Sequence, residues 1–227
     1  MSYLLRLVVP DKPGILGAVA TALGAAGVDI VSLDVLERGS GVAVDDIVVD
    51  LPAGRLPDSL ITAAHTVAGV SVESLRPFAG PLDTHRELEL LDALARAAEG
   101  TSAKLLAAEL PRVFHSGWAV VLSAVDTPAA GPATWEVTAA SEAAPAFEGL
   151  TLPWMPLTGP RLLPSEEDWL PERWRDMAIE MMAAPYGGPG CAVVLGRSGG
   201  PAFRRSELLR LAHLTGIATT VASLPPV

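Results

Sequence analysis

Hydrophobic and polar positions in the first eighty residues repeat with the periods of short strands and amphipathic helices. Four runs have the apolar or alternating pattern of strands, and two have apolar residues every three to four positions. The predicted elements are a strand at residues 3–9, a helix at 15–26, strands at 28–37 and 42–51, a helix at 57–67 and a strand at 70–76. This βαββαβ order predicts a ferredoxin-like α+β domain, in which two helices cover one face of a four-stranded antiparallel sheet.

A second pattern follows a boundary that is rich in Pro and Gly. Residues 79–84 predict a linker between a domain at 1–78 and a domain at 85–227. The second domain is expected to contain an antiparallel sheet with flanking helices, interrupted by an unassigned Pro- and Trp-rich segment at 141–176. Its predicted elements are helices at 85–99 and 102–115, strands at 118–125, 134–140, 177–186 and 191–197, and a helix at 206–223.

Composition and charge narrow the classes of function. A formal net charge of -10 and a pI of about 4.8 oppose binding to nucleic acid, which requires clustered Lys and Arg. The longest charge-free runs, among them 13–28 and 211–227 with His213 taken as neutral, are shorter than the roughly 18 to 20 apolar residues of a membrane span. No secretory signal is evident, so we expect a cytoplasmic protein without a membrane partner. Four acidic strand residues are expected to face solvent or to discourage unwanted strand pairing at an edge: Asp34, Asp45, Asp46 and Asp50.

The sequence gives no reason to expect an enzyme, a metal or a cofactor. Gly196–Gly200 fit the G-x-S-x-G pattern of a hydrolase nucleophile elbow. That elbow needs a helix directly behind the serine, whereas the next helix is predicted from Ser206. The four histidines lack ligand spacing, and Cys191 is the single cysteine, which excludes a disulfide within one chain.

The turn between the first strand and the first helix carries the candidate chemistry. Pro13 fixes its own φ and holds Lys12 out of helical geometry, while Gly14 permits close approach to the main chain. Free N–H groups at a helix start favour an anion such as an α-carboxylate. Asp11 and Asp29 would supply negative charge for an ammonium group, so the turn predicts a site for a zwitterionic amino acid. The alternative is that Asp11 only caps the helix and Gly14 is only a turn residue.

Residues 11–30, DKPGILGAVATALGAAGVDI, resemble the ACT domain, whose motif is a D-x-P-G-x-L turn followed by a G-V-D/N-I strand start. ACT domains commonly pair through their sheet edges and hold an amino acid or similar effector at the dimer interface. Amino-acid-binding members often have Asn where this chain has Asp11 and Asp29. The resemblance implies a ligand site at the matching positions, which are Asp11, Pro13, Gly14, Ile15, Leu16, Asp29 and Ile30.

Residues 85–224 resemble a GAF domain, with Phe203 and Glu207 at the recognisable positions after the late hairpin. This resemblance implies either a small-molecule pocket between the sheet and its variable loops or dimerisation through the outer helices. Cyclic-nucleotide-binding members have an Asn-Lys pair where this chain has Gly196 and Arg197. A cyclic nucleotide is therefore not the expected ligand.

These patterns together favour a non-catalytic regulatory protein. We expect a homodimer that senses an amino acid or a related metabolite at its ACT interface and acts on an unidentified partner protein. The alternative is a ligand-free regulatory or structural subunit that associates with a partner enzyme. The two hypotheses differ in whether the isolated protein binds a metabolite.

Overall fold

The computed structural model describes residues 1–78, 85–98, 100–125, 134–147, 149–188 and 190–222. The chain divides into two compact units, an N-terminal unit at Met1–Asp83 and a C-terminal unit at Thr84–Val227. Each unit is α+β and is built on one antiparallel sheet. The predicted linker, residues 79–84, lies outside the described residues.

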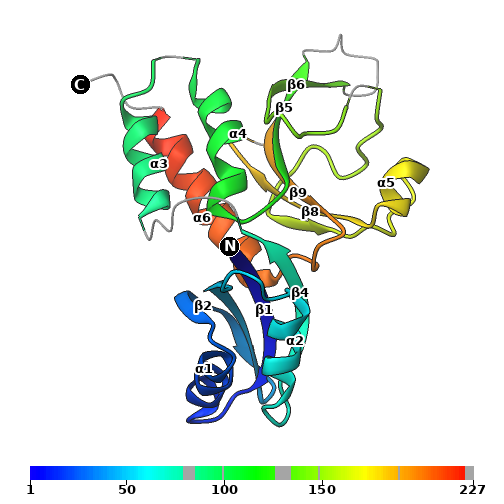
Figure 1. Ribbon diagram of the computed structural model, residues 1–227. Helices are drawn as coiled ribbons and strands as arrows, with labels where there is room; N and C mark the ends of the chain where they lie inside the picture. The colour runs from blue at the N-terminus through cyan, green and yellow to red at the C-terminus, as the bar shows by residue number, and fades with distance from the viewer. Residues whose placement is uncertain (79–84, 99, 126–133, 148, 189, 223–227) are drawn as a thin grey trace. The chain divides into compact units, whose positions relative to one another are not determined.

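The N-terminal unit has the predicted βαββαβ order. Its elements are β1 (Ser2–Pro10), α1 (Ile15–Ala25), β2 (Asp29–Gly39), β3 (Val42–Asp50), α2 (Asp58–His65) and β4 (Ser71–Pro77). The strands lie in the order β2-β3-β1-β4, and all neighbours are antiparallel. Both helices cover the same face of the sheet (Figure 1). The fold is therefore ferredoxin-like, with β1 and β3 central and β2 at an edge.

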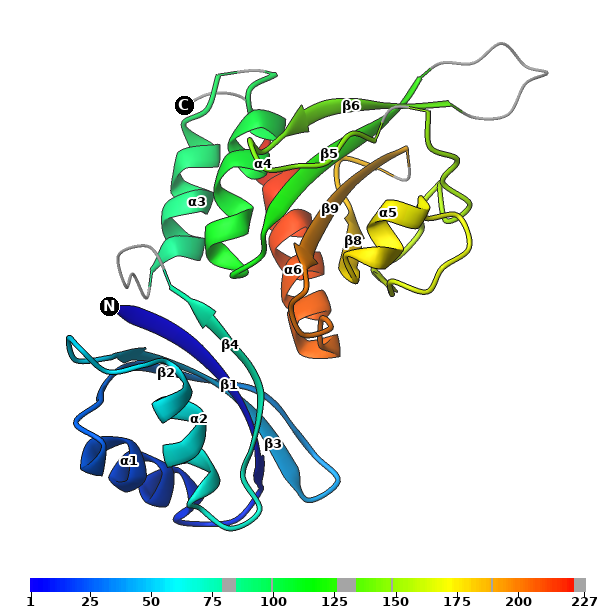
Figure 2. The same cartoon turned by 45° about the vertical axis from the view of Figure 1, so that its right-hand side comes forward.

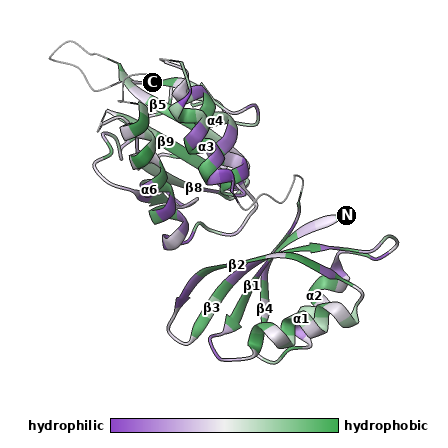
Figure 3. Cartoon of the chain, turned by 90° about the vertical axis from the view of Figure 1, so that its left-hand side faces the viewer, coloured by the Kyte–Doolittle hydropathy of each residue, from purple (hydrophilic) through white to green (hydrophobic). Residues whose placement is uncertain are grey.

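The core of this unit lies between the sheet and its two helices. The central strands are predominantly hydrophobic (Figure 3). Alternate residues of β1, such as Leu5 and Leu7, pack with Val19 and Leu23 of α1 and with Leu60 of α2. Because side chains alternate along a strand, these contacts identify which face of each strand the helices cover.

Two of the four acidic strand residues are buried, so the expectation that all four face solvent or lie at an edge is wrong. Asp34 and Asp50 are exposed, whereas Asp45 is 1% and Asp46 4% exposed. Asp46 is paired with Arg6 of β1, whose Nε donates to Oδ1 at 2.7 Å and whose Nη2 donates to Oδ2 at 2.9 Å. The sequence pattern did not reveal that β3 is a central strand, where acidic side chains can be buried beside a neighbouring strand.

The C-terminal unit contains a five-stranded sheet in the order β6-β5-β9-β8-β7. Helices α3, α4 and α6 lie on one face of this sheet (Figure 2). Its elements are α3 (Arg86–Ala95), α4 (Ser102–Val113), β5 (Trp118–Val125), β6 (Thr134–Ala140), β7 (Arg161–Leu163), α5 (Glu172–Asp176), β8 (Ile179–Pro185), β9 (Cys191–Ser198) and α6 (Arg205–Ala222). The unassigned segment thus supplies β7 and α5.

Two hydrophobic clusters lie on opposite faces of this second sheet. Ala119 and Val121 of β5 pack toward the helices, while Trp118 and Val120 pack toward the other face. On that other face, aromatic residues of the 141–176 segment cover the strands. Trp174 contacts Trp118 with 6.2 Å between the ring centroids. These aromatic side chains anchor a segment that has little regular structure.

Candidate functional site

The turn after β1 has an open and uncapped helix start. Gly14 has φ 86° and ψ -9°, in the left-handed region that glycine adopts without strain from a Cβ atom. The first turn of α1 has no side-chain cap and no acidic residue. Apart from their chain neighbours and the backbone of the helix itself, no atom of the described residues lies within 4 Å of the position that a Cβ of Gly14 or Gly17 would occupy. The Ile15 N–H donates to the Lys12 carbonyl at 3.4 Å, and the amide groups that follow it in the first turn of α1 are placed to receive an anion.

Asp11 does not cap this helix, so the capping alternative is wrong for that residue. Its carboxylate instead accepts hydrogen bonds from Arg38, at 2.6 Å between Nη2 and Oδ1 and at 3.2 Å between Nε and Oδ1. The Asp11 N–H donates to the Gly41 carbonyl at 2.9 Å, which ties the turn to the β2–β3 hairpin. Arg38 was not singled out from the sequence. Its position between the predicted strands 28–37 and 42–51 could have indicated that it lies near the end of that hairpin.

Asp45 lies beside this ion pair in the interior of the unit. It stands opposite Leu7 of β1 and Val35 of β2, on the face that α1 and α2 cover. Neither carboxylate oxygen has a hydrogen-bond partner within the described residues. Burial, and then repulsion from Asp46, raise the pKa of the Asp45 carboxyl above its ordinary value, while the charge of Arg38 opposes the change. The turn region thus has a buried acid behind an exposed ion pair.

The structure does not bring all the predicted site residues together within one chain. Asp29 and Ile30 begin β2 at the far end of the strand from the turn. In the register with β3, Asp29 stands opposite Asp50 and Gly39 stands opposite Val42. Eight positions of β3 therefore separate the two ends of β2, which is a distance of about 26 Å. The remaining predicted residues all lie at the turn end: Asp11, Pro13, Gly14, Ile15 and Leu16.

The far end of β2 is acidic. Asp29 and Asp50 are both exposed and stand directly opposite one another in the β2–β3 register. Like charges in such a pair repel, and a bound cation would relieve the repulsion. A register shift between Ile30 and Ser32 places Asp29 on the face opposite to Leu33, so the alternation expected over 28–37 is interrupted.

Strand β2 also presents an apolar edge. Within the described residues it pairs with β3 alone, which leaves its other side open. Val31 and Leu33 are each 38% exposed and Val35 is 48% exposed. An open edge strand with exposed large aliphatic side chains favours pairing with another chain.

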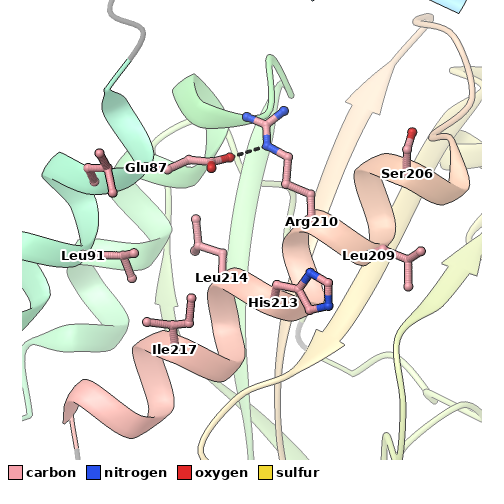
Figure 4. Close-up of a pocket in the computed structure, with 9 residues that line it drawn as sticks. Glu87, Leu91, Ser206, Leu209, Arg210, His213, Leu214 and Ile217 are labelled. Carbon is pink, nitrogen blue, oxygen red and sulfur yellow. Dashed lines mark hydrogen bonds and ion pairs between the residues drawn. The ribbon is translucent and has the colours of Figure 1, made fainter. Parts of the chain in front are cut away.

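A second candidate site lies in the helical layer of the C-terminal unit. Helices α3 and α6 enclose a groove with a volume of about 560 Å³ (Figure 4). Arg210 forms an ion pair with Glu87 across the groove, and its Nη2 donates to the Val113 carbonyl at 3.0 Å. This ion pair links α3 to α6 across the groove. The lining residues are Glu87, Leu88, Leu91, Ser206, Leu209, Arg210, His213, Leu214 and Ile217.

The segment from Gly196 to Gly200 joins β9 to α6 and lacks the geometry of a nucleophile elbow. Ser198 ends β9, and α6 does not begin until Arg205. Buried Arg197 donates to Glu207 at 2.8 Å and lies over the ring of Phe203, with 3.8 Å from Cζ to the centroid. The two residues that carried the GAF resemblance therefore hold a buried arginine.

Two further features concern metals and membranes. Across the described ranges, no group of three or more His, Cys, Asp or Glu side chains is placed to hold a metal ion. In the same part of the chain, no helix has the length and apolar character needed to cross a bilayer.

Comparison with protein families matches the ACT domain to residues 3–69. The match confirms the ACT domain of the N-terminal unit and indicates a regulatory role in binding small molecules. The GAF resemblance of the C-terminal unit stays a prediction. Comparison with curated proteins found no match.

The similar solved structures are distant. They include an unknown protein from Galdieria sulphuraria, 17% identical over 59% of this chain and 76% of that chain, with a TM-score of 0.30. A formyltetrahydrofolate deformylase from Pseudomonas putida KT2440 is 15% identical over 41% and 37%, with a TM-score of 0.28. The quorum-quenching acylase GqqA is 19% identical over 34% and 43%, with a TM-score of 0.25. At such TM-scores these likenesses carry no argument about function.

Proposed function

We propose that this chain is a non-catalytic regulatory protein whose ACT domain binds an amino acid or a related metabolite between two copies. Each copy would supply the turn of one site and the start of β2 of the other. The observation that carries this proposal is that the uncapped helix start and the acidic pair lie at opposite ends of one open edge strand.

When the β2 strands of two copies pair antiparallel, the first residues of each strand lie beside the last residues of the other. In an interface with two-fold symmetry, the same surface serves both partners, so each acidic end meets the other copy's turn. The pairing would also satisfy the open backbone edge of β2 and cover the exposed Val31, Leu33 and Val35. One arrangement therefore accounts for the apolar edge and for the separation of the predicted site residues.

The combined site matches the charges of an α-amino acid. The first amide groups of α1 would receive the carboxylate, because unpaired N–H groups and the helix dipole both favour an anion. The acidic pair of Asp29 and Asp50 lies on the sheet face away from the helices, so its charge would attract the ammonium group across the end of the strand without direct contact. A zwitterion places both charges on neighbouring atoms, so it would bridge the two copies and stabilise the dimer.

The C-terminal unit would carry the response to ligand binding. We propose that it is a GAF-like domain that acts on an unidentified partner protein in the cytoplasm. The resemblance is supported by the antiparallel sheet and its flanking helices. It is also supported by the contacts that Phe203 and Glu207 make with buried Arg197. The acidic composition argues against nucleic acid as the partner.

Thermal unfolding against the twenty amino acids and common nucleotides tests the proposed function. An amino acid at about 100 times its Kd should stabilise the dimer by about 2.7 kcal/mol, which raises Tm by about 5 to 10 °C. Asp29→Ala should lose this shift, because the ammonium group loses a charged partner. The control is Asp58→Ala, which removes an exposed acid from α2 and should retain the shift.

Two other outcomes of this screen would contradict a ligand site at the ACT turn. A shift that Asp29→Ala retains would place the ligand elsewhere, with the groove between α3 and α6 as the next candidate. An unchanged Tm with every compound would favour the ligand-free subunit that associates with a partner enzyme.

A further inference from the structure

Arg38 is the strongest cationic feature at the turn of the proposed site. Its guanidinium contacts both oxygens of Asp11, through Nη2 to Oδ1 at 2.6 Å and through Nε to Oδ1 at 3.2 Å and Oδ2 at 3.3 Å. These three contacts fix one edge of the planar group. The Nη1 group makes no hydrogen bond within the described residues, and the side chain is 66% exposed. One edge of Arg38 is thus held while the rest of the group faces outward.

The buried acid beside Arg38 shows that this cation belongs to a larger cluster. Arg38 stands opposite Ala43, and Asp45 lies two positions further along β3 on the same helix-covered face. Asp45 is 1% exposed, and both its oxygens lack a hydrogen-bond partner among the described residues. Hydrogen bonding to Asp11, the charge of Asp11 and, more weakly, the charge of Asp45 raise the pKa of Arg38 above its ordinary value. An arginine guanidinium is charged at every physiological pH, so Arg38 is a permanent cation at the turn.

We propose that Arg38 recognises the carboxylate of the bound amino acid and that Asp11 is a positioning residue for its guanidinium. This inference rests on the proposed function and names a recognition residue of the same site. A planar guanidinium can donate two parallel N–H groups to a carboxylate, which an ammonium group cannot do in that geometry. Asp11 then pairs with Arg38 of its own chain, and the ammonium group of the ligand is attracted by Asp29 of the partner subunit.

This assignment resolves a conflict in the predicted site. With Asp11 and Asp29 both facing the ligand, two carboxylates would repel the ligand's own carboxylate. In the structure the Arg38 guanidinium balances Asp11, so the turn presents a cation together with the uncapped start of α1. Lys12, the other cation of the turn, is exposed and forms no side-chain hydrogen bond or ion pair within the described residues. It is the competing candidate and needs its own variant.

Paired probes separate recognition of the carboxylate from a structural role of Arg38. Calorimetry would compare each of the twenty amino acids with its α-carboxamide, which keeps the ammonium group and the side chain but lacks the negative charge. The wild-type protein should bind one amino acid at least about tenfold more tightly than its carboxamide. Arg38→Gln should reduce this preference to about threefold or less, with the remainder due to the amide groups of α1, and Asp11→Asn should reduce it by a smaller factor. Arg55→Gln, an exposed arginine after β3, is the matched control and should keep it.

The outcomes distinguish this inference from the proposed function. Arg38→Gln is expected to fold, because exposed ion pairs contribute little to stability, and unchanged circular dichroism would confirm this. Equal weakening of acid and carboxamide would show that Arg38 only ties the hairpin to the turn and would overturn the inference. Loss of the preference in Lys12→Gln alone would overturn it in favour of Lys12. If the wild-type protein binds no amino acid, the proposed function fails first and the role of Arg38 fails with it.

Discussion

Asp45 places a carboxyl group inside the N-terminal unit without a hydrogen-bond partner in the described part of the chain. Burial without such a partner disfavours the ionised form of an acid. The raised pKa of Asp45 follows first from this burial and then from repulsion by Asp46. An acid whose pKa is raised by folding opposes the folded state at a pH where it is ionised.

We expect Asp45→Asn to raise the free energy of unfolding at pH 7. A raised pKa in the folded state means that the protonated acid stabilises the fold. This contribution is complete below the ordinary pKa of about 3.9 and is lost as pH rises through the folded-state pKa. The advantage of the variant should therefore shrink toward about pH 4. Urea unfolding at several pH values measures it, with exposed Asp34→Asn as the control; a less stable variant at pH 7 would show that the ionised group is favourable.

Two glycines, one in helix α1 and one in strand β9, differ in the space that is available for a side chain. Gly17, in the first turns of α1, has open space where a Cβ would lie. A Cβ at Gly196 of β9 would instead overlap the indole ring of Trp118. That ring cannot readily move, because it is buried and packs against Phe147 with 5.6 Å between the centroids.

The two glycine-to-alanine substitutions should have opposite effects on stability. Gly17→Ala should stabilise the N-terminal unit by up to about 1 kcal/mol, because alanine has the higher helix propensity. Gly196→Ala should destabilise the C-terminal unit by about 1 to 3 kcal/mol through overpacking. Calorimetric unfolding of each variant checks both signs. A neutral Gly196→Ala would mean that the Trp118 cluster can rearrange at little cost.

Local patterns predicted the regular elements better than they predicted the site. Strands β5 and β6 have the predicted bounds, since each is an apolar or alternating run between polar turns. The 141–176 segment could not be assigned because tertiary contacts of its aromatic side chains, not a period, determine its course. Pro13 and Gly14 restrict the turn locally, so its shape could be predicted. The Asp11–Arg38 pair depends on the hairpin register that brings Gly41 beside Asp11, which no local pattern reveals.

For the whole molecule, the central claim is that each ligand site is shared between two copies. In one chain the two ends of β2, beside which the two parts of the site lie, are about 26 Å apart, which no single amino acid spans. Ligand binding and dimerisation would then stabilise each other, because the ligand contacts both copies only when they are paired. The effector would act by shifting the population of the dimer.

Amino-acid binding by mixed dimers tests this claim most directly. Asp29→Ala removes the ammonium partner, and Gly17→Glu places a carboxylate at the helix start, where it favours the helix but excludes an anionic ligand. Neither variant alone should bind, whereas Gly17→Ala, the neutral control, should bind normally. In an equal mixture, about half of the dimers are mixed and each has one intact site, so binding should return to about a quarter of the wild-type stoichiometry. No recovery in the mixture, with mixed dimers verified, would contradict the claim, since both residues would then serve the same copy's site.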